Sequence, residues 1–323
     1  MTRWNQTIDN PSPLLTYSPE WMWQVVTNIS DPEGYSQYSN GSTATTTSFV
    51  GAMVNFTFFG TGVWVYGAKR PNYAYYNVTL NGNKTSTFTA QSDNSVFGQA
   101  LYGASNLPYG LHTLSIANAG SSPSTIMSGS NDTSIDIDWL VWETEYDGPG
   151  GPVNAQVSQV TFDNNHPRFL YTGSWSSQTN ADGPSNGTDQ YTTSSDASLQ
   201  FTFDGDAIAL YGSVGVDHGD FVANVDGMQS KTLSGHWNES GYMQMLYYVE
   251  NLGAGTHNLN VDNKPTSSSE DGFNVDYVTT WTARGGSQSV AAAPEKKYVL
   301  HSQRSVDQSR LTFTSLLGVR LLQ

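Results

Sequence analysis

The sequence predicts an all-β protein that consists of two tandem β-sandwiches of the jelly-roll type and an irregular C-terminal tail. Apolar and polar residues alternate along many short segments, as expected for strands with one face in the core and one in water. The 31 glycines and 13 prolines among 323 residues suit tight turns, and no stretch shows sustained helical spacing. Many segments occur twice, which predicts a duplicated fold.

The first hairpin is predicted from the stretch FTFFGTGVWVYG, residues 56–67. Within it Phe56 and Phe58 share one face, Thr57 lies on the other, and Trp64 is expected to face outward. The inward positions on this and the later strands are Val54, Phe56, Phe58, Val63, Val65, Val78, Leu80, Leu114 and Ile116. A sheet that is wet on one face must bury the other against a second sheet, which predicts a β-sandwich.

The same pattern returns as FTFDGDAIALYG at residues 201–212, an offset of 145 positions. Further along, NLPYGLHTLSIAN matches NLGAGTHNLNVDN at the same offset, so that His112 falls on His257. The inward positions of this second copy are Leu199, Phe201, Phe203, Ile208, Leu210, Leu259 and Val261. One constant offset over some 60 residues indicates an internal duplication.

Domain boundaries are predicted from changes in composition. We expect a first jelly-roll domain at residues 1–147 and a second at 156–284, because each copy runs from a Thr-apolar-Asp-Asn start to an apolar-Asp-aromatic finish. The run DGPGGP predicts a Gly/Pro hinge at 148–155, since glycine and proline interrupt strands. Beyond Arg284 the composition shifts and becomes basic, so residues 285–323 are interpreted as a disordered or irregular tail.

The charge of the chain argues against nucleic acid as a partner. There are 28 acidic and 13 basic residues, a formal net charge of −15, and such a surface repels phosphate backbones. There is no cysteine, which excludes disulfides and thiolate metal sites. No window reaches the roughly 20 apolar residues of a membrane helix, and no apolar leader segment is visible, so we expect no membrane span in this sequence.

Glycosylation motifs favour a secreted or cell-surface glycoprotein. Asn-x-Ser/Thr triplets begin at Asn5, Asn28, Asn40, Asn55, Asn77, Asn83, Asn131, Asn186 and Asn238. Asn55 and Asn77 have the outward parity of their strands, which agrees with glycan attachment. We therefore expect an extracellular or cell-surface location.

The last strands of each copy carry a resemblance to a known family. GLHTL followed by IDIDWLVW, and AGTHNL followed by FNVDYV, resemble the galactose-binding-like jelly rolls, in particular carbohydrate-binding modules. The stretch GTGVWVYGAKRPN resembles tandem-jelly-roll surface proteins of basidiomycete fungi. The resemblance covers roughly residues 7–284 and implies a carbohydrate-binding fold.

The resemblance also implies a structural calcium ion in each copy. The acidic residue of the last strand and an acid near the first strand hold such an ion in related modules, and the matching pairs here are Asp9 with Asp138 and Asp163 with Asp276. Calcium takes about six to eight oxygen ligands, so carbonyls and water would complete the shell. The alternative is that each aspartate only caps backbone N–H groups where first and last strands meet.

The resemblance further implies a sugar contact from the residue two positions before the strand aspartate. Asn274 is the matching residue in the second copy, and Asp136 stands at this place in the first. Because the family uses an asparagine here, the second copy fits the pattern better.

The loop after the first hairpin is a candidate ligand site on its own chemistry. Its sequence AKRPNYAYY contains Lys69, Arg70, Asn72, Tyr73, Tyr75 and Tyr76, and the corresponding loop SVGVDHGDF contains Asp217, His218 and Asp220. Sugar sites combine an aromatic face with a few amides or carboxylates. Further aromatic candidates are Trp21, Trp23, Trp139, Trp175 and Trp237. For each aromatic the alternative is core packing.

Enzyme motifs are scarce in this sequence. It contains no Gly-x-Ser-x-Gly elbow, no phosphate loop and no HExxH pair. His112 and His257 share the parity of core residues, so we expect them to be buried, neutral and hydrogen-bonded to backbone. Asp136 and Asp138 point the same way on one strand, but a packed sandwich offers them no cleft for a sugar ring.

The sequence therefore predicts a non-catalytic extracellular or cell-surface binding protein whose ligand is a carbohydrate or cell-wall glycan. Two sites on one chain would raise avidity for a polymer. One alternative is a structural or adhesive glycosylated surface protein without a small-molecule ligand. Another is a glycan-active hydrolase or esterase. No cofactor is expected to be required beyond the calcium that the resemblance implies.

Overall fold

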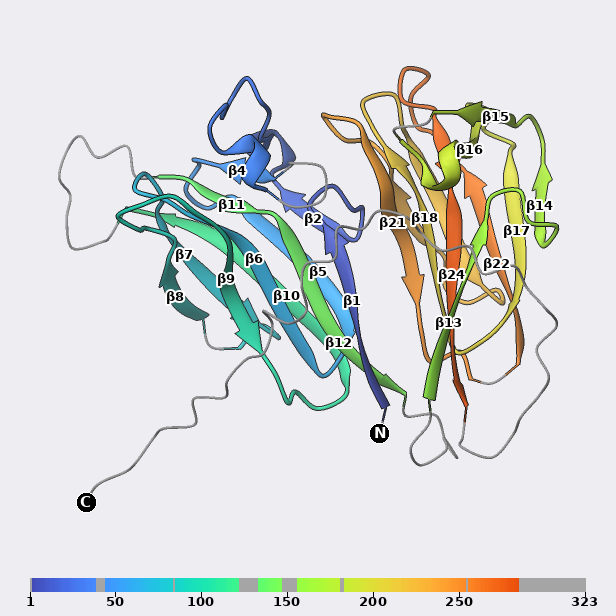
Figure 1. The fold of residues 1–323 in the computed structure, drawn as a ribbon, viewed down its shortest axis with the longest axis horizontal. Coiled ribbons are helices and arrows are strands. Elements are labelled where there is room, and N and C mark those ends of the chain that lie inside the picture. The colour runs from blue at the N-terminus through green and yellow to red at the C-terminus, as the bar shows by residue number, and fades with distance from the viewer. Residues whose placement is uncertain are drawn as a thin grey trace. The chain divides into compact units, whose positions relative to one another are not determined.

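The computed structural model describes residues 2–38, 44–83, 85–121, 133–146, 156–180, 183–253 and 255–284 (Figure 1). These residues form β-strands and loops, and among them there is no α-helix, only short 3-10 turns. The all-β class that the two-residue periodicity predicts is therefore confirmed. The hinge expected at 148–155 and the tail expected at 285–323 lie outside the described residues.

Residues of the first copy form three sheets. The first sheet has the order β1-β12-β6-β9, from β1 (Thr2–Asp9), β12 (Trp139–Tyr146), β6 (Gly62–Lys69) and β9 (Val96–Ala104). The second has the order β2-β5-β10-β7-β8, from β2 (Leu15–Ser18), β5 (Met53–Gly60), β10 (Gly110–Gly120), β7 (Tyr75–Leu80) and β8 (Thr85–Thr89). The third joins β11 (Ile135–Ile137), β4 (Thr45–Thr47) and β3 (Gln24–Val25), and two 3-10 turns, η1 (Glu20–Met22) and η2 (Tyr35–Gln37), lie in the loops.

Residues of the second copy form three sheets with the same connectivity. The first has the order β13-β24-β18-β21, from β13 (Gln156–Asp163), β24 (Tyr277–Arg284), β18 (Ala207–Val214) and β21 (Gly241–Val249). The second has the order β14-β17-β22-β19-β20, from β14 (Phe169–Thr172), β17 (Ser198–Asp204), β22 (Thr256–Asn263), β19 (Asp220–Val225) and β20 (Lys231–Ser234). The third joins β15 (Ser176–Thr179), β16 (Thr188–Thr192) and β23 (Phe273–Val275), and the 3-10 turn η3 (Ser185–Gly187) precedes β16.

The repeat seen in the sequence is thus a repeat of strand order. The last strand of each copy pairs antiparallel with the first, β12 with β1 and β24 with β13, in register along eight residues. The described residues of both copies group into one compact unit, so the number of domains and their boundaries stay predictions.

The hairpin expected at residues 56–67 is not formed. The strands β5 and β6 that it contains belong to two different sheets, so the chain passes from one sheet to the other between them. A side chain at Gly60 would bring its Cβ within 2.2 Å of the carbonyl oxygen of Glu143 on β12, which explains the glycine at this corner. Phe56 on one sheet then packs against Trp142 on the other, with ring centroids 5.3 Å apart.

The core lies between the first two sheets of each copy, as the alternation predicted. Every inward position named from the sequence is buried except Leu80, which is half-buried and packs against the core. Trp64, expected to face outward, is half-buried. The parity of the strands is therefore confirmed.

The final strand of each copy is broken at the aspartate that the sequence motif contains. Asp138 separates β11 from β12, and Asp276 separates β23 from β24. At the break the main chain of Asp138 donates to the carbonyl of Tyr66 at 2.9 Å and accepts from the amide of Asn10 at 2.9 Å. The two strand segments can therefore join different sheets.

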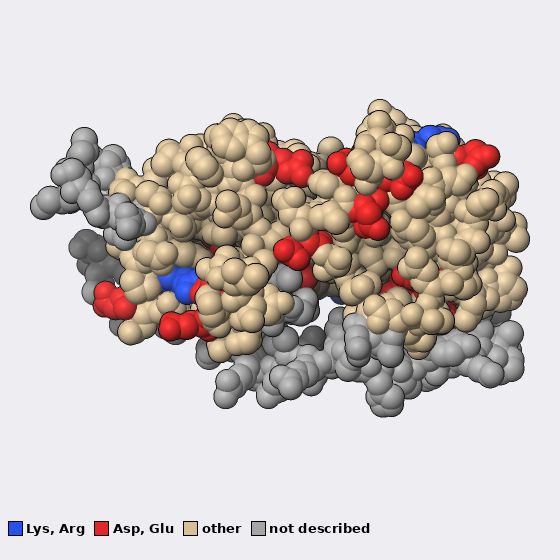
Figure 2. Space-filling view, turned by 90° about the horizontal axis from the view of Figure 1, so that it is seen from above, with Lys and Arg blue, Asp and Glu red and all other residues tan. Residues whose placement is uncertain are grey.

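The surface has the acidic character expected from the composition. Figure 2 shows acidic side chains spread over one face of the molecule, with few basic ones among them. Within the described residues, no helix has the length and apolar character needed to cross a membrane.

Candidate functional site

An open depression lies between η2, the start of β9 and the start of β12, with a volume of about 440 Å³. Its lining residues are Gln37, Ser95, Val96, Phe97, Gly98, Gln99 and Trp139. Three segments that are far apart in the sequence thus meet here. The side chains combine aromatic rings with two amides, which is the mixture that carbohydrate sites use.

A β-bulge shapes the wall of the depression. Where β9 pairs with β6, Phe97 and Gly98 oppose a single residue of β6. Gly98 has a φ of 63°, a conformation that glycine adopts without steric cost. Bulges bend a strand and redirect its side chains, and here the bulge brings Phe97 to the depression.

Trp139 is the large aromatic side chain of the depression. Its ring stacks on Tyr66, the residue opposite it on β6, with centroids 4.6 Å apart and planes 6° from parallel. A Cβ atom at Gly98 would lie 3.4 Å from the indole Cη2 of Trp139. The missing side chain at Gly98 therefore leaves this edge of the indole accessible from the depression.

The position of Phe97 is fixed from behind by two residues. Tyr38 packs edge-on against its ring, with centroids 5.0 Å apart and an interplanar angle of 89°. The guanidinium carbon of Arg70 lies 5.3 Å from the centroid of the same ring. Such cation–π contacts add about 0.5–1 kcal/mol at accessible sites.

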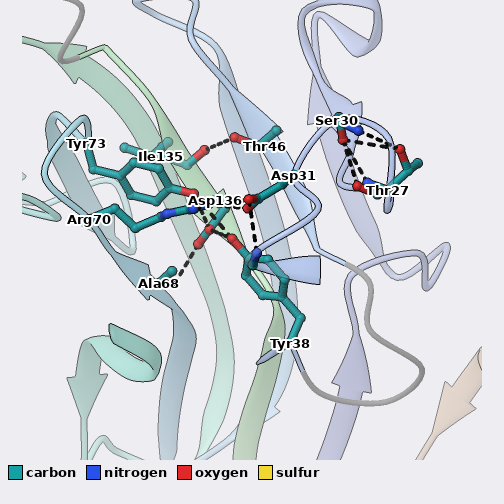
Figure 3. A network of polar contacts seen from close by, with 11 residues as sticks. Thr27, Ser30, Asp31, Tyr38, Thr46, Ala68, Arg70, Tyr73, Ile135 and Asp136 are labelled. Atoms are coloured by element: carbon teal, nitrogen blue, oxygen red, sulfur yellow. Dashed lines mark hydrogen bonds and ion pairs between the residues drawn. The ribbon is translucent and has the colours of Figure 1, made fainter. Parts of the chain in front are cut away.

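Asp136 lies at the centre of the polar network behind the depression (Figure 3). Its Oδ2 accepts hydrogen bonds from the hydroxyl groups of Tyr38 and Tyr73, each at 2.5 Å, and its Oδ1 accepts from the amide of Ala68 at 2.7 Å. The side chain has no solvent exposure. Burial raises the pKa of Asp136, while the two hydroxyl groups, the amide and the Arg70 charge lower it. Asp136 therefore positions the two tyrosines.

Arg70 is held by an ion pair with Asp31, visible beside the tyrosines in Figure 3. Asp31 Oδ1 also accepts from the amide of Gly34 at 3.1 Å. The hydrogen bond from Arg70 lowers the pKa of Asp31 against the opposing effect of burial. The loop before η2 is thereby tied to the residue that follows β6.

The second copy has different chemistry at the place of Asp136. Asn274 accepts from the amide of Ser213 through Oδ1, and its Nδ2 donates to Asp189 Oδ2 at 2.7 Å and to Ser213 Oγ at 2.8 Å. Only 3% of Asn274 is exposed. The side chains of Asn274 and Asp136 are thus both buried in hydrogen-bonded networks of protein groups.

His218 takes the place of Tyr73 in the second copy. Its Nδ1 lies 2.9 Å from Oδ1 of the exposed Asp217, whereas its buried Nε2 has no hydrogen-bond partner. The imidazole lies edge-on to Tyr191, with centroids 6.1 Å apart. The two loops that the sequence singles out are therefore both partly buried, and they differ in chemistry.

The remaining candidate ligand residues lie around the loop after β6. Tyr73 and Tyr76 are buried, and the Tyr76 hydroxyl donates to the carbonyl of Leu101 at 2.6 Å. Lys69 and Tyr75 are half-buried, and Asn72 is exposed. None of the six predicted residues of this loop lines the depression described above.

Sequence reasoning missed most of the depression. It named Trp139 as an aromatic candidate but not Phe97, Gly98, Gln99 or Gln37. A signal was available, because the stretch VFGQALY at residues 96–102 aligns with GYMQMLY at residues 241–247, at the same offset as the rest of the repeat. The alignment places Gln99 on a second glutamine, but the depression itself depends on the bulge.

The predicted calcium residues occupy the strand breaks. Asp276 Oδ2 accepts a hydrogen bond from the backbone amide of Ser185 at 2.8 Å. This contact corresponds to the alternative in which the aspartate only caps a backbone N–H group. The buried Oδ1 atoms of Asp276 and Asp189 have no hydrogen-bond partner, an arrangement compatible with a cation. In the part of the chain that the structure describes, no group of three or more His, Cys, Asp or Glu side chains fits a metal ion. Calcium stays a prediction for Asp9 with Asp138 and for Asp163 with Asp276.

The two histidines expected in the core, His112 and His257, are both buried, and His257 also bonds to the carboxyl group of Asp226. His112 bonds to the carbonyl of Pro108 at 2.8 Å and to Asn81 at 2.9 Å. His257 bonds to the carbonyl of Gly253 at 3.0 Å, and its Nδ1 lies 2.6 Å from Asp226 Oδ2. Burial lowers the pKa of His257, but the bonds to Asp226 and Gly253 outweigh it and raise the pKa. His257 therefore has the expected backbone partner and, in addition, a carboxyl partner that the sequence did not indicate.

Two curated proteins of Flavonifractor plautii are similar to this chain. One, an A type blood alpha-D-galactosamine galactosaminidase, is 25% identical over 240 residues, which is 73% of this chain and 20% of that protein. The other, an A type blood N-acetyl-alpha-D-galactosamine deacetylase, is 32% identical over 114 residues, or 34% of this chain and 14% of that protein. The chain therefore spans a fifth or less of the length of these relatives.

The solved structures that match this chain include several carbohydrate-active proteins. A Paenibacillus xanthan lyase matches 82% of this chain and 25% of its own, with 16% identity and a TM-score of 0.30. A GH26-CBM35 mannanase of Podospora anserina matches 47% of this chain and 30% of its own, with 17% identity and a TM-score of 0.28. The ANX2 ectodomain of Arabidopsis thaliana matches 88% of this chain and 97% of its own, with 7% identity and a TM-score of 0.29. At these values the likeness carries no functional inference.

No protein-family description matches the chain. The resemblance to carbohydrate-binding modules agrees with the all-β fold of the chain. The resemblance to basidiomycete surface proteins stays a prediction.

The comparisons correct the function that the sequence predicts. A non-catalytic binding protein was expected because no catalytic motif is visible, yet both curated relatives are named as enzymes that act on galactosamine-containing glycans. That prediction relied on a search for motifs that are local in sequence, and such a search does not detect catalytic residues that are assembled from distant positions.

Proposed function

We propose that this chain works in a glycan-active enzyme whose substrates are glycans that carry galactosamine or its N-acetylated form. The observation that carries the proposal is the 25% identity to the galactosaminidase over 240 residues, a length greater than that of either copy of the repeat. The relative that is a deacetylase acts on the same class of sugar by its name. The two relatives are named for different reactions on the same class of sugar, so we infer that recognition of this sugar is what they share with the chain.

The depression on β9 is the proposed place where the glycan is held. Trp139 offers an indole edge for the apolar side of a pyranose, and Gln37 and Gln99 offer amides for its hydroxyl or acetamido groups. None of the lining residues is an acid or a base. In the proposal this depression therefore orients the substrate, and the groups that transfer protons come from other residues.

The enzyme proposal is tested with the full 323-residue chain. Oligosaccharides that end in N-acetylgalactosamine, in galactosamine or in galactose are incubated with the protein, and released sugar and acetate are followed by mass spectrometry. Release from either amino sugar but not from galactose is the expected result. A pure, folded chain that leaves all three oligosaccharides unchanged at high enzyme concentration contradicts the proposal.

An extracellular or cell-surface location is also proposed, on the strength of the glycosylation motifs. Five of the described motif asparagines, Asn5, Asn28, Asn83, Asn186 and Asn238, are exposed, and Asn55 and Asn77 are half-buried. Asn40 and Asn131 lie outside the described residues. A loss of mass on treatment of the native protein with an N-glycanase supports this location, and an unmodified protein from its own source counts against it.

A further inference from the structure

The two copies differ in one residue at the turning point of the bulge that forms the depression. Gly98 on β9 has a φ of 63°, and the corresponding residue on β21 is Met243, with a φ of 55°. The bulge is the same in both copies, because Tyr242 and Met243 also oppose a single residue of β18. The backbone is therefore repeated here, while the side chain is not.

The surroundings of this residue are repeated as well. Tyr211 and Tyr277 stack with centroids 4.4 Å apart and planes 14° from parallel, as the aromatic pair beside the depression does. Gln244 donates from Nε2 to the carbonyl of Tyr242 at 2.9 Å, as the glutamine of the first copy does to Phe97. The second copy thus has the aromatic stack and the amide of a glycan site at the same place.

Met243 changes what this place can accept. In the first copy a Cβ at Gly98 would already lie 3.4 Å from Trp139, so a longer side chain would extend over the indole or into the depression. A methionine at positive φ is unusual, since side chains with a Cβ are disfavoured there. Backbone preference therefore does not account for Met243, whose partly exposed side chain begins at the bulge position that Gly98 occupies in the first copy.

We propose that Gly98 keeps the depression of the first copy open to a pyranose ring, and that Met243 covers the corresponding place on β21. The inference rests on the proposed function, because it assumes that the chain engages glycans that carry N-acetylgalactosamine or galactosamine. The duplicated chain then has one glycan-contacting bulge instead of two. The residue at the bulge decides which copy binds.

The first experiment fills the open depression. The full chain and its Gly98→Met variant are titrated with an oligosaccharide that ends in N-acetylgalactosamine, by calorimetry. We expect the variant to bind at least about tenfold more weakly, because a misplaced side chain excludes the ring. Gly82→Met is the matched control, since Gly82 also has a φ of 63° and an added Cβ would meet nothing within 4 Å.

The second experiment opens the covered place. Met243→Gly removes the side chain and leaves a residue that adopts positive φ readily. We expect the number of bound oligosaccharides per chain to rise from one to two, with the melting temperature unchanged or higher. Met228→Gly, at another exposed methionine, is the control and should leave the number at one.

The outcomes separate this inference from the proposed function. If the wild-type chain binds and Gly98→Met binds equally well, the role of Gly98 is refuted while the proposed function stands. A Met243→Gly variant that still binds one oligosaccharide refutes the covering role of Met243. If the folded wild-type chain neither binds nor converts amino-sugar glycans, both the proposed function and the inference fall.

Discussion

Asp136 is a buried carboxyl group that organises the side chains behind the depression. The carboxylate is fully buried, and it accepts three hydrogen bonds from Tyr38, Tyr73 and the amide of Ala68. A buried carboxylate is costly unless donors surround it, and here each donor also gains a fixed partner. Tyr38 is held in this way, and Tyr38 in turn supports Phe97 at the depression.

The first prediction concerns Asp136→Asn. The amide supplies one acceptor oxygen in place of two, so at least one of the three donors loses its acceptor, and we expect the free energy of unfolding to fall by about 1–3 kcal/mol. Glycan binding should weaken too, because Phe97 loses its support. Urea denaturation measures the first effect, with the exposed Asp217→Asn as control. Unchanged stability would show that the network does not constrain the fold.

Glu250 is a second residue whose charge is set by its surroundings. It follows β21, and it accepts from Thr144 Oγ1 of β12 at 2.7 Å and from the Tyr248 hydroxyl at 2.6 Å. Burial raises the pKa of Glu250 to about 7, although these two hydrogen bonds oppose the rise. The carboxyl is therefore protonated in the folded protein at pH values where the unfolded chain ionises it.

The second prediction is a pH dependence of stability that Glu250→Gln reduces. Because the folded pKa is raised, the contribution of Glu250 is fully present below about pH 4.5 and is lost as the pH rises through about 7. The variant should be more stable than wild type at pH 8, by up to about 3 kcal/mol, and equal to it near pH 4.5. Thermal melts across this range test it. A difference that is the same at both pH values would contradict the raised pKa.

At the scale of elements, two local irregularities decide what the sheets can do. The corner at Gly60 sends β5 and β6 into facing sheets, so their apolar faces enclose one core. The bulge at Phe97 and Gly98 turns the start of β9 toward Trp139 and opens the depression. Regular strands would give neither feature, because regular pairing keeps side chains alternating across one sheet.

The third prediction concerns the break between β23 and β24. If a calcium ion is held near Asp276, it would offset the repulsion among the carboxylates of Asp163, Asp189 and Asp276, and chelation would lower the melting temperature. Asp276→Asn should abolish the response to calcium, while Asp262→Asn, at a residue outside this group, should retain it. A melting temperature that is the same with calcium and with chelator would leave capping of Ser185 as the role of Asp276.

At the scale of the whole molecule, the described residues of both copies belong to one compact unit. The buried apolar residues form one cluster that includes side chains of both copies. Two contacts join residues of the first copy to residues of the second. The rings of Trp142 and Tyr248 have centroids 5.3 Å apart, and Ser12 Oγ donates to the carbonyl of Met245 at 2.6 Å. Such contacts couple the stability of one copy to that of the other.

The fourth prediction follows from this coupling. Phe56→Ala and Phe201→Ala remove equivalent buried rings, and each should cost about 3–5 kcal/mol of unfolding free energy. We expect both variants to shift a single unfolding transition in calorimetry, since the two copies share a core. Leu170→Ala, at an exposed leucine, serves as the control. Two transitions, of which each variant moves only one, would show that the copies unfold independently.

Much of the fold could be predicted because the strand signal is local. Alternation along 56–67 places Phe56 and Phe58 in the core without knowledge of any partner. The site was harder to predict, because Phe97 and Trp139 come together only through the bulge of β9 and the pairing with β6. Asp136 and Asn274 were found by motif, but their burial depends on neighbours from distant segments.

The order of amino acids alone establishes the all-β class, the inward faces of the strands and the repeat, because alternation and self-similarity need no distant contact. Tertiary structure decides that β5 and β6 lie in facing sheets, that Asp136 is enclosed by tyrosines, and that Gly98 opens a depression beside Trp139. Sheet pairing, bulges and burial arise from contacts between residues far apart in the chain, and no local pattern encodes them.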